Sequence, residues 1–430
     1  MMNIAMIGAG YVGLVTGACF AELGNKVICV DCDRAKIASL KKLKIPIYEP
    51  GLEELVKRNH AHGRITFTTD ITTAVKKSAL VFIAVGTPPK ENGEADLTGI
   101  EHVARTIAKS MNSYRLIVEK STVPVETGKW VRHTIEINKK KNVAFDVASN
   151  PEFLREGQAI KDFMQPDRIV IGVESRKAEK MLRELYAPIK APILVTDIKS
   201  AELIKHASNS FLALKISFIN AVSRACDLSG ADIELVAEGM GLDRRIGRSF
   251  LDAGIGFGGF CLPKDVEAFI RICEKLGYSF DLLKEVKRIN EFQKAEFVRK
   301  IESHLWNIKG KTIGVLGLSF KPDTDDMRFA PSIDIITALQ RHGAKIRATD
   351  PQAMSRARGI FKQVVFCKDA YEAARGCDCL IVVTEWNEFK EMDFKKIKKL
   401  MNQPLVIDGR NMYDPKEMTR LGFKYISMGR

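Results

Sequence analysis

The chain has 430 residues, enough for two or three domains, and its 46% hydrophobic and 28% charged residues are the usual balance of a globular protein with a buried core. This balance excludes a disordered chain, and 31 glycines and 15 prolines spread without a period exclude a collagen-like one. The net charge of +14 would suit nucleic acid, an anionic membrane or an acidic small molecule. Because the basic residues are dispersed, we expect solvated helix faces and no nucleic-acid partner.

The N-terminal residues are apolar, but they do not predict a membrane segment. No charged side chain precedes Glu22, yet four glycines dilute the stretch and it lacks the basic start of a signal peptide. No other stretch is long and apolar enough for a transmembrane helix. We therefore expect a cytoplasmic protein without a membrane partner.

Apolar runs alternate with helical patterns through the first part of the chain, which is typical of parallel α/β units. A helix is predicted at 11–23, after a glycine turn. Short buried strands are predicted at 3–7, 26–30, 80–85, 116–119 and 143–148.

The middle of the chain reads as helical. Residues 201–229 contain neither Gly nor Pro and carry apolar residues at helical spacing, which predicts one long helix. A second helical zone is predicted at 265–308, interrupted near Gly277. The α/β pattern then returns, with a helix at 332–341 and strands at 312–318, 345–348, 380–384 and 405–407. The sequence thus predicts two α/β domains on either side of a helical connector. Each α/β domain opens with strand, glycine turn, helix, strand and Asp, the last being Asp31 or Asp350.

The first glycine turn predicts a dinucleotide site. Residues 8–13 read GAGYVG between a predicted strand and a predicted helix. The glycines allow a tight turn and the close approach of a pyrophosphate to the helix N-terminus, whose free N–H groups favour anions. Asp31 ends the next strand, where its carboxylate would bind a ribose and repel a 2′-phosphate. The pattern favours NAD over NADP, with FAD or a purely structural turn as the alternatives.

A second glycine-rich segment predicts a reactive cysteine. Residues 254–265 read GIGFGGFCLPKD, and Cys261 would lie at the start of a helix, next to Lys264. Both features would lower the pKa of its thiol and favour the nucleophilic thiolate. A lone cysteine is more often a core residue, but this setting predicts a nucleophile.

Eight segments, in order along nearly the whole chain, carry a resemblance to the NAD-dependent nucleotide-sugar dehydrogenases, and among them to the UDP-glucose 6-dehydrogenases. They read IGAGYVGLVTGACFAELG, AVGTPP, EKSTVPVETG, NPEFLREG, AELIKHASNSFLALKISFIN, GIGFGGFCLPKD, FKPDTDDMR and IDGRNMYD. The resemblance implies an α/β fold of two Rossmann-like, doubly wound domains joined by a long central helix, around which a homodimer forms. We place the NAD-binding domain at 1–197, the central helical dimerisation domain at 198–300 and the UDP-sugar-binding domain at 301–430.

The resemblance also implies an activity, the four-electron oxidation of UDP-glucose to UDP-glucuronate through a thiohemiacetal and a thioester on Cys261, with no metal. Lys205 and Asn209 would hold and polarise the reacting sugar oxygen, and Asp265 would take part in proton transfer. The remaining predicted catalytic residues are Glu152, as the base for thioester hydrolysis, and Thr122, which would position water.

Binding residues are implied in the same way. Cofactor contacts are expected at Gly8, Gly10, Tyr11, Val12, Gly13, Asp31, Lys36, Thr87, Ser121, Thr122, Glu156, Lys264 and Arg328. Contacts to the nucleotide-sugar are expected at Glu152, Phe153, Leu154, Lys205, Asn209, Arg245, Phe250, Leu251, Gly258, Phe320, Lys321 and Arg410. Of these, Arg245 would reach the site of the neighbouring subunit.

Three alternatives stay open at this point. The chain could be a sister enzyme acting on GDP-mannose or a UDP-N-acetylhexosamine, a nucleotide-sugar sensor without activity, or a nucleic-acid-binding protein. Two residues depart from the family pattern: Phe260 stands where Ser is most frequent, and His206 stands where Tyr is frequent.

Overall fold

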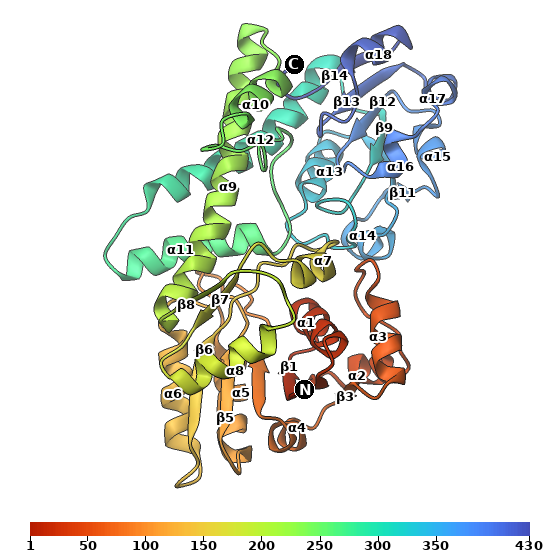
Figure 1. The fold of residues 1–430 in the computed structure, drawn as a ribbon. Coiled ribbons are helices and arrows are strands. Elements are labelled where there is room, and N and C mark those ends of the chain that lie inside the picture. The colour runs from red at the N-terminus through yellow and green to blue at the C-terminus, as the bar shows by residue number, and fades with distance from the viewer. The chain divides into compact units, whose positions relative to one another are not determined.

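The computed structural model describes residues 1–430, and the chain divides into two compact units (Figure 1). Residues 1–208 with 267–277 form the first unit, and residues 209–266 with 278–430 form the second. Helices α9 (Ile198–Ser229) and α11 (Cys261–Lys275) each contribute residues to both units. The boundaries of the three-domain division stay a prediction. None of the helices combines the length and the apolar character needed to span a bilayer.

The first unit is built on an eight-stranded sheet in the order β3-β2-β1-β4-β5-β6-β7-β8. Every neighbouring pair is parallel except β6 with β7. The order of the first six strands is that of a doubly wound nucleotide-binding sheet. The strands are β1 (Asn3–Ile7), β2 (Lys26–Val30), β3 (Ile65–Thr68), β4 (Leu80–Ile83), β5 (Arg115–Glu119), β6 (Phe145–Ser149), β7 (Ile169–Gly172) and β8 (Ile193–Thr196).

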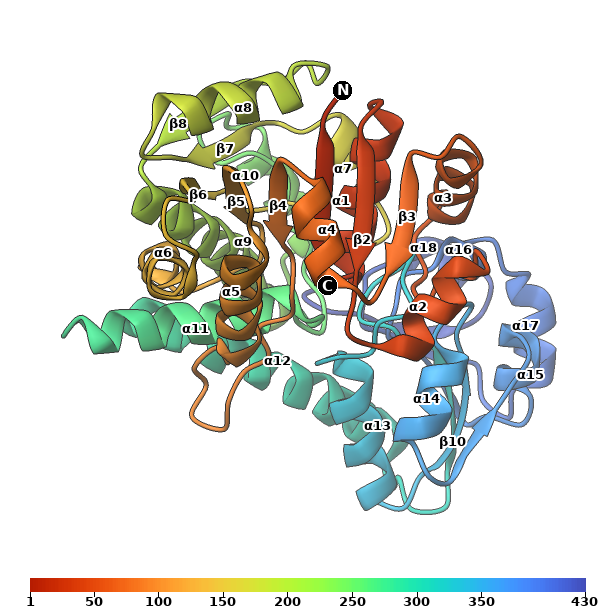
Figure 2. The same cartoon turned by 90° about the horizontal axis from the view of Figure 1, so that it is seen from below.

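Helices cover both faces of this sheet (Figure 2). Alternate residues of a strand point to opposite faces, so Ile4 and Met6 join one core cluster while Ala5 and Ile7 join the other. The first cluster receives α1 (Tyr11–Glu22), α2 (Arg34–Lys41), α3 (Leu52–Ala61), α7 (Ala159–Met164) and α8 (Arg176–Tyr186). The second receives α4 (Ile71–Lys77), α5 (Thr98–Ser110) and α6 (Thr127–Asn138).

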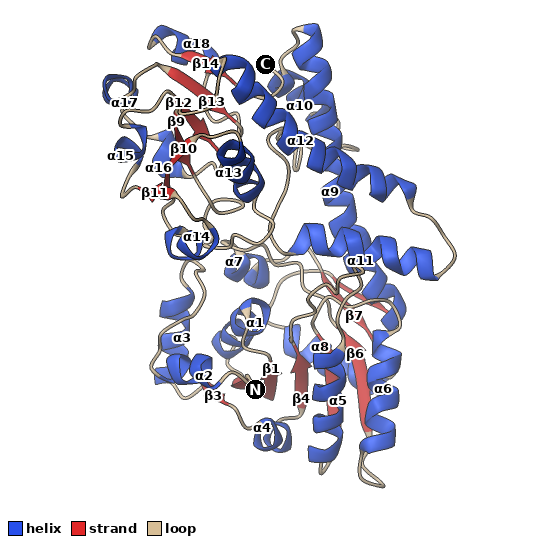
Figure 3. Ribbon diagram, turned by 180° about the vertical axis from the view of Figure 1, so that it is seen from behind, coloured by secondary structure: helices blue, strands red, loops and turns tan.

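The second unit repeats the same plan with a six-stranded parallel sheet. Its order is β11-β10-β9-β12-β13-β14, made of β9 (Thr312–Leu316), β10 (Lys345–Thr349), β11 (Val364–Phe366), β12 (Cys379–Val382), β13 (Leu405–Asp408) and β14 (Lys424–Ile426). One face is covered by α12 (Asp281–Leu305), α13 (Pro331–Arg341) and α14 (Met354–Ile360). The other is covered by α15 (Ala370–Ala374), α16 (Asn387–Lys390), α17 (Phe394–Leu400) and α18 (Pro415–Arg420). Figure 3 shows these helices on both sides of the strands.

A separate small core joins α9 to α10 (Ile233–Gly241) within the second unit. Ile219 and Cys226 of α9 pack there against Ile233 and Ala237 of α10. The residues that precede the glycine-rich segment also enter this core, through Leu251. The end of α9 and the glycine-rich segment are therefore supported by the same apolar cluster.

The structure confirms the predicted α/β class and the two Rossmann-like sheets. The long helix starts at Ile198, three residues earlier than predicted, because the Asp197 carboxylate accepts the N–H of Ser200 at 2.9 Å and caps it. The predicted zone 265–308 is two helices, α11 and α12, which separate around Gly277 at φ +82°. Strands β3, β7, β8, β11 and β14 were not predicted.

Candidate active site

The glycine turn after β1 has the geometry of a dinucleotide-binding turn. Gly8 has φ +103°, and a Cβ there would lie 2.4 Å from the carbonyl oxygen of Ala84. A Cβ on Gly13 would lie 1.8 Å from the carbonyl oxygen of Gly8. Only glycine fits at either position, so the chain turns tightly into α1 and leaves the helix N-terminus open to an anion.

Asp31 lies beside this turn, at the end of β2. Its carboxylate accepts the N–H groups of Ala9 and Asp33, each at 3.0 Å, and the ammonium of Lys36 at 2.7 Å. Burial acts to raise its pKa, but these three donors keep the pKa of Asp31 below its usual value. The ionised carboxylate fits an adenosine ribose and disfavours a 2′-phosphate. The predicted cofactor residue Lys36 is thus an ion-pair partner of Asp31.

Two predicted cofactor residues join the ends of β4 and β5. The Thr87 hydroxyl donates to the carbonyl oxygen of Thr122 at 2.9 Å. The Ser121 hydroxyl donates to the carbonyl oxygen of Val85 at 2.8 Å. These bonds fix the backbone of both strand ends at the edge where doubly wound sheets bind ligands.

Glu152 and Lys205 form a buried ion pair in the first unit. Their side chains are 6% and 4% exposed, and the Lys205 Nζ lies 3.2 Å from the Glu152 carboxylate. The N–H of Leu154 also donates to Glu152, at 2.6 Å. Burial lowers the pKa of the nearby Lys120 to about 7, an effect that Glu152 opposes. The structure therefore brings together the predicted base and the predicted lysine.

The rest of the segment after β6 is organised by contacts that the sequence does not reveal. Phe153 packs under the Arg168 guanidinium, 3.8 Å from the ring centroid, with the Lys205 ammonium at 5.3 Å. Glu49 is buried and accepts the N–H groups of Gly157 at 2.7 Å and Ala159 at 2.8 Å.

Glu49 also accepts the hydroxyl of Tyr11, which lies in the glycine turn. This carboxylate thereby links the turn to the segment that holds Glu152, Phe153, Leu154 and Glu156. No local motif identifies Glu49, since its partners lie far along the chain.

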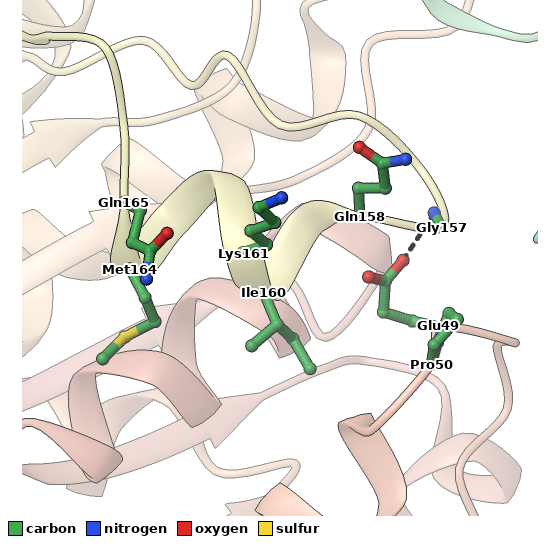
Figure 4. Close-up of a pocket in the computed structure, with 8 residues that line it drawn as sticks. All are labelled: Glu49, Pro50, Gly157, Gln158, Ile160, Lys161, Met164 and Gln165. Carbon is green, nitrogen blue, oxygen red and sulfur yellow. Dashed lines mark hydrogen bonds between the residues drawn. The ribbon is translucent and has the colours of Figure 1, made fainter.

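A shallow hollow of about 490 Å³ lies beside α7 (Figure 4). It is lined by Glu49, Pro50, Gly157, Gln158, Ile160, Lys161, Met164 and Gln165. None of these is among the site residues that the sequence predicts.

The second unit holds the predicted nucleophile. Cys261 is the first residue of α11, and Asp265 lies one turn later on the same helix. Asp265 is 1% exposed, accepts the amide of Asn209 at 2.6 Å and pairs with the ammonium of Lys264 at 2.6 Å. Asn209 in turn lies one turn after Lys205 on α9. The predicted catalytic residues Asn209, Cys261 and Asp265 are therefore close together in this unit.

Three buried amides hold the glycine-rich segment in place. Asn220 of α9 accepts the N–H of Gly254 at 2.9 Å, and Gln293 of α12 donates to the carbonyl of Gly254 at 2.8 Å. Asn290 of α12 makes two bonds to the backbone of Phe257, at 2.8 and 3.0 Å. The sequence does not distinguish these amides from solvated ones, because a polar residue within a helical pattern usually faces water.

Arg410 connects the glycine-rich segment to the end of the second sheet. Its guanidinium donates to the carbonyl oxygens of Val383 at 2.8 Å, Gly256 at 3.2 Å and Phe320 at 3.3 Å. It is also 3.2 Å from the Glu385 carboxylate. The predicted neighbours Phe320 and Lys321 are joined by a cation–π contact of 5.8 Å. Gly258 is tightly enclosed, since a Cβ there would lie 2.3 Å from the Phe329 carbonyl oxygen.

Arg328 stacks on the residue that departs from the family pattern. Its guanidinium carbon lies 4.1 Å from the centre of the Phe260 ring, and Asp326 holds the same guanidinium at 2.6 and 2.9 Å. The Lys264 ammonium lies 5.5 Å from that ring. Phe260 thus faces two predicted cofactor contacts.

The remaining predicted substrate residues differ in exposure. Leu251 is buried in the small core of the second unit. Phe250, which precedes it, has the uncommon φ of +66°. The Arg245 side chain is 89% exposed and pairs with Asp243 of its own turn.

The second unit has a counterpart of Asp31, at the end of β10. Asp350 is buried and accepts the N–H groups of Leu318 at 2.7 Å and Ser319 at 3.0 Å. It also accepts the indole N–H of Trp386 at 3.1 Å and the N–H groups of Gln352 and Ala353 at 2.9 and 2.7 Å. All of its lone pairs are therefore directed at the protein itself.

Three models of one family match most of the chain. The NAD binding domain of the UDP-glucose/GDP-mannose dehydrogenase family matches residues 2–190, its central domain 199–292 and its UDP binding domain 314–415. The UDP-glucose 6-dehydrogenase TuaD of Bacillus subtilis is 51% identical over 431 residues, which cover 100% of this chain and 94% of the relative. The UDP-glucose 6-dehydrogenase of Rhizobium meliloti is 47% identical, with both chains fully covered.

Solved structures give the same result. A UDP-glucose dehydrogenase from Pyrobaculum islandicum superposes with a TM-score of 0.93 at 39% identity, covering 100% of this chain and 97% of the other. A UDP-D-ManNAc dehydrogenase from Pyrococcus horikoshii gives 0.88 at 27% identity, covering 100% and 99%.

Proposed function

The chain belongs to the UDP-glucose/GDP-mannose dehydrogenase family, and from this premise we propose that it oxidises the C6 alcohol of UDP-glucose to the carboxylate of UDP-glucuronate with NAD. The observation that carries the proposal is identity of 47% to 51% over the whole chain with three UDP-glucose 6-dehydrogenases. The glycine turn and the ionised Asp31 fit NAD. Two molecules of NAD, bound one after the other, would supply the hydride acceptors for the two oxidations.

The first oxidation needs a base and a stabilised alkoxide. Lys205 and Asn209 would hold the C6 oxygen, since they lie one turn apart on one helix. Asp265, already hydrogen-bonded to Asn209, would receive the proton through a water molecule. This oxidation leaves an aldehyde at C6.

The second oxidation needs a covalent intermediate. The Cys261 thiolate would add to the aldehyde to form a thiohemiacetal, and loss of the C6 hydride would convert this to a thioester. Water then adds to the thioester carbonyl, the C–S bond breaks, and the products are the carboxylate and the free thiol. Glu152 would accept the proton of that water, and Thr122 would hold the water in place.

A direct test is to incubate the protein with UDP-glucose and NAD and to count NADH per sugar. Two NADH and one UDP-glucuronate per sugar are expected. A single NADH, with the aldehyde as final product, would refute the four-electron reaction.

The nearest alternative substrate is another nucleotide-sugar, such as GDP-mannose or a UDP-N-acetylhexosamine. UDP-glucose is favoured because identity to the solved UDP-glucose dehydrogenase is 39%, against 27% to the UDP-D-ManNAc dehydrogenase. Initial rates with each sugar at equal concentration decide between them.

We propose a homodimer formed around α9. Phe211 and Phe218 lie seven residues apart on this helix and are 60% and 49% exposed, and Leu235 and Leu242 after it are 67% and 79% exposed. Apolar side chains repeated on one side of a helix support contact with a second copy. The exposed Arg245 would then reach the partner's site. Sedimentation of the wild type and of Phe218→Glu tests this, since the variant should be monomeric.

The cytoplasmic location is a further proposal. None of the nine cysteines forms a disulfide, which suits a reducing compartment. The covalent step would require Cys261 to remain reduced.

A further inference from the structure

One face of α9 is bonded to the segment that follows Thr122. Ile198, Glu202 and His206 are spaced four residues apart, so they share a face in the first three turns of the helix. The buried Glu202 carboxylate accepts the N–H of Glu126 at 2.7 Å and the N–H of Gly128 at 2.8 Å. These donors belong to the N-terminus of α6. They act to lower the pKa of Glu202, but burial outweighs them and raises it to about 7.

His206 makes the other bond of this contact. Its Nε2 lies 2.8 Å from the carbonyl oxygen of Val123, the residue after Thr122. A carbonyl oxygen only accepts, so Nε2 carries the proton and donates it. The ring also packs 5.9 Å from Phe269. A tyrosine, which the family often has here, keeps a ring with a donor at its tip, so the departure preserves the bond type.

The segment lies so close to α9 that a side chain is excluded. A Cβ on Gly128 would be 2.6 Å from the Ile198 side chain and 3.4 Å from the Glu202 carboxylate. From its other side, Thr122 is held through its carbonyl oxygen by the Thr87 hydroxyl at 2.9 Å. The backbone from Thr122 to Gly128 is thus held by four named hydrogen bonds.

Lys205 lies on the adjoining face of the same helix, between Glu202 and His206 in sequence, and pairs there with Glu152. We infer that Glu202 and His206 are positioning residues that hold Thr122 at a fixed place relative to Lys205 and Glu152. Through this they serve the hydrolysis of the thioester, the step in which water attacks the C6 carbonyl and the Cys261 thiol leaves. The inference rests on the proposed function.

The test is Glu202→Gln in the full chain. Each carboxylate oxygen of Glu202 accepts one backbone N–H, from Glu126 or Gly128. In glutamine an NH₂ group replaces one of these oxygens, so one hydrogen bond is lost and two donors face each other. Hydrolysis follows both hydride transfers, so slowing it should produce a pre-steady-state burst that approaches two NADH per site. We expect kcat to fall roughly tenfold to a hundredfold, as for misplacement of a reacting group by about 1 Å. The kcat/KM values for UDP-glucose and NAD should stay within twofold, because hydrolysis follows both hydride transfers and its slowing lowers KM together with kcat.

Lys199→Met is the matched control. It removes an ion pair of 2.9 Å between the same helix and Glu126, but at an exposed position. Its kcat and burst should equal those of the wild type. His206→Phe should behave like Glu202→Gln, and His206→Tyr should restore kcat because it returns a donor.

The outcomes separate this inference from the proposed function. A Glu202→Gln protein with wild-type kcat, or with a lower kcat and no increased burst, overturns the positioning role while UDP-glucuronate formation by the wild type still stands. A wild type that makes no NADH from UDP-glucose overturns the proposed function instead. If Glu202→Gln does not fold, the His206 pair decides: equal activity of the Phe and Tyr variants refutes the inference.

Discussion

Phe260 stands where the family most often has serine, and the contribution of its contact with Arg328 can be measured. The ring lies under the Arg328 guanidinium at 4.1 Å, and the Arg328 side chain is 48% exposed. A cation–π contact at a partly exposed site contributes about 0.5–1 kcal/mol. Asp326 would still hold the guanidinium if the ring were removed, so this figure is the whole expected loss.

Phe260→Leu keeps the bulk beside Cys261 but removes the aromatic face. If Arg328 contacts the cofactor, 0.5–1 kcal/mol corresponds to a rise of about two- to fivefold in the KM for NAD. The KM for UDP-glucose should not change. Phe260→Trp keeps the aromatic face, so its KM for NAD should be equal to or lower than that of the wild type.

Steady-state kinetics with each substrate varied in turn provides the measurement. If the Leu and Trp variants have the same KM for NAD, then the size of the side chain matters and not its aromatic face. That result would refute the predicted cation–π contribution. A change confined to the KM for UDP-glucose would indicate that Arg328 contacts the nucleotide-sugar and not the cofactor.

Four further predictions concern other parts of the site. Asp31→Ser should narrow the preference for NAD over NADP, measured as the ratio of kcat/KM, because it removes the charge that repels a 2′-phosphate; an unchanged ratio would exclude Asp31 from the ribose site. Cys261→Ala should still reduce NAD slowly but form no UDP-glucuronate, whereas normal acid formation would disprove the covalent route. Arg410→Ala should raise the KM for UDP-glucose roughly tenfold to a hundredfold, the equivalent of about 1.5–3 kcal/mol for a charge-assisted contact; no change would remove Arg410 from the substrate site. Burial raises the pKa of Glu119 to about 8, which the N–H and hydroxyl of Ser121 oppose, so the folded chain keeps a proton that the unfolded chain loses near pH 4.3. The contribution of Glu119 to stability therefore falls as pH rises through this window, and Glu119→Gln should raise the Tm at about pH 9 but not at about pH 4.

A helix or strand is predicted best from the sequence where the residues next to it in the chain determine its structure. Asn3–Ile7 and Lys26–Val30 are predicted to the residue because each is a short apolar run bounded by a glycine turn or a helix. The edge strands β3 and β14 escape prediction because they are three or four residues long and partly exposed, so their apolar pattern is weak. Their pairing partners, which lie far along the chain, are what make them strands.

The same distinction separates the predicted and missed site residues. Asp31 and Cys261 could be singled out in the sequence because each stands at a short, regular spacing from a cluster of glycines. Glu202 and Asn290 are not, because their partners are backbone groups 76 and 33 residues away. A buried acid or amide on a helix looks, in sequence, like one that faces water.

The two sheets share a strand order, but the aspartate that follows the second strand of each differs in its surroundings. Asp31 accepts hydrogen bonds from its turn, and its side chain stays 10% exposed beside Lys36. Asp350 is closed off by the indole of Trp386 and by backbone donors. A ribose would find no acceptor at the second position, although the topology is the same. One carboxylate therefore keeps the position expected for a contact to the cofactor, while the other is enclosed by hydrogen-bond donors of the protein itself.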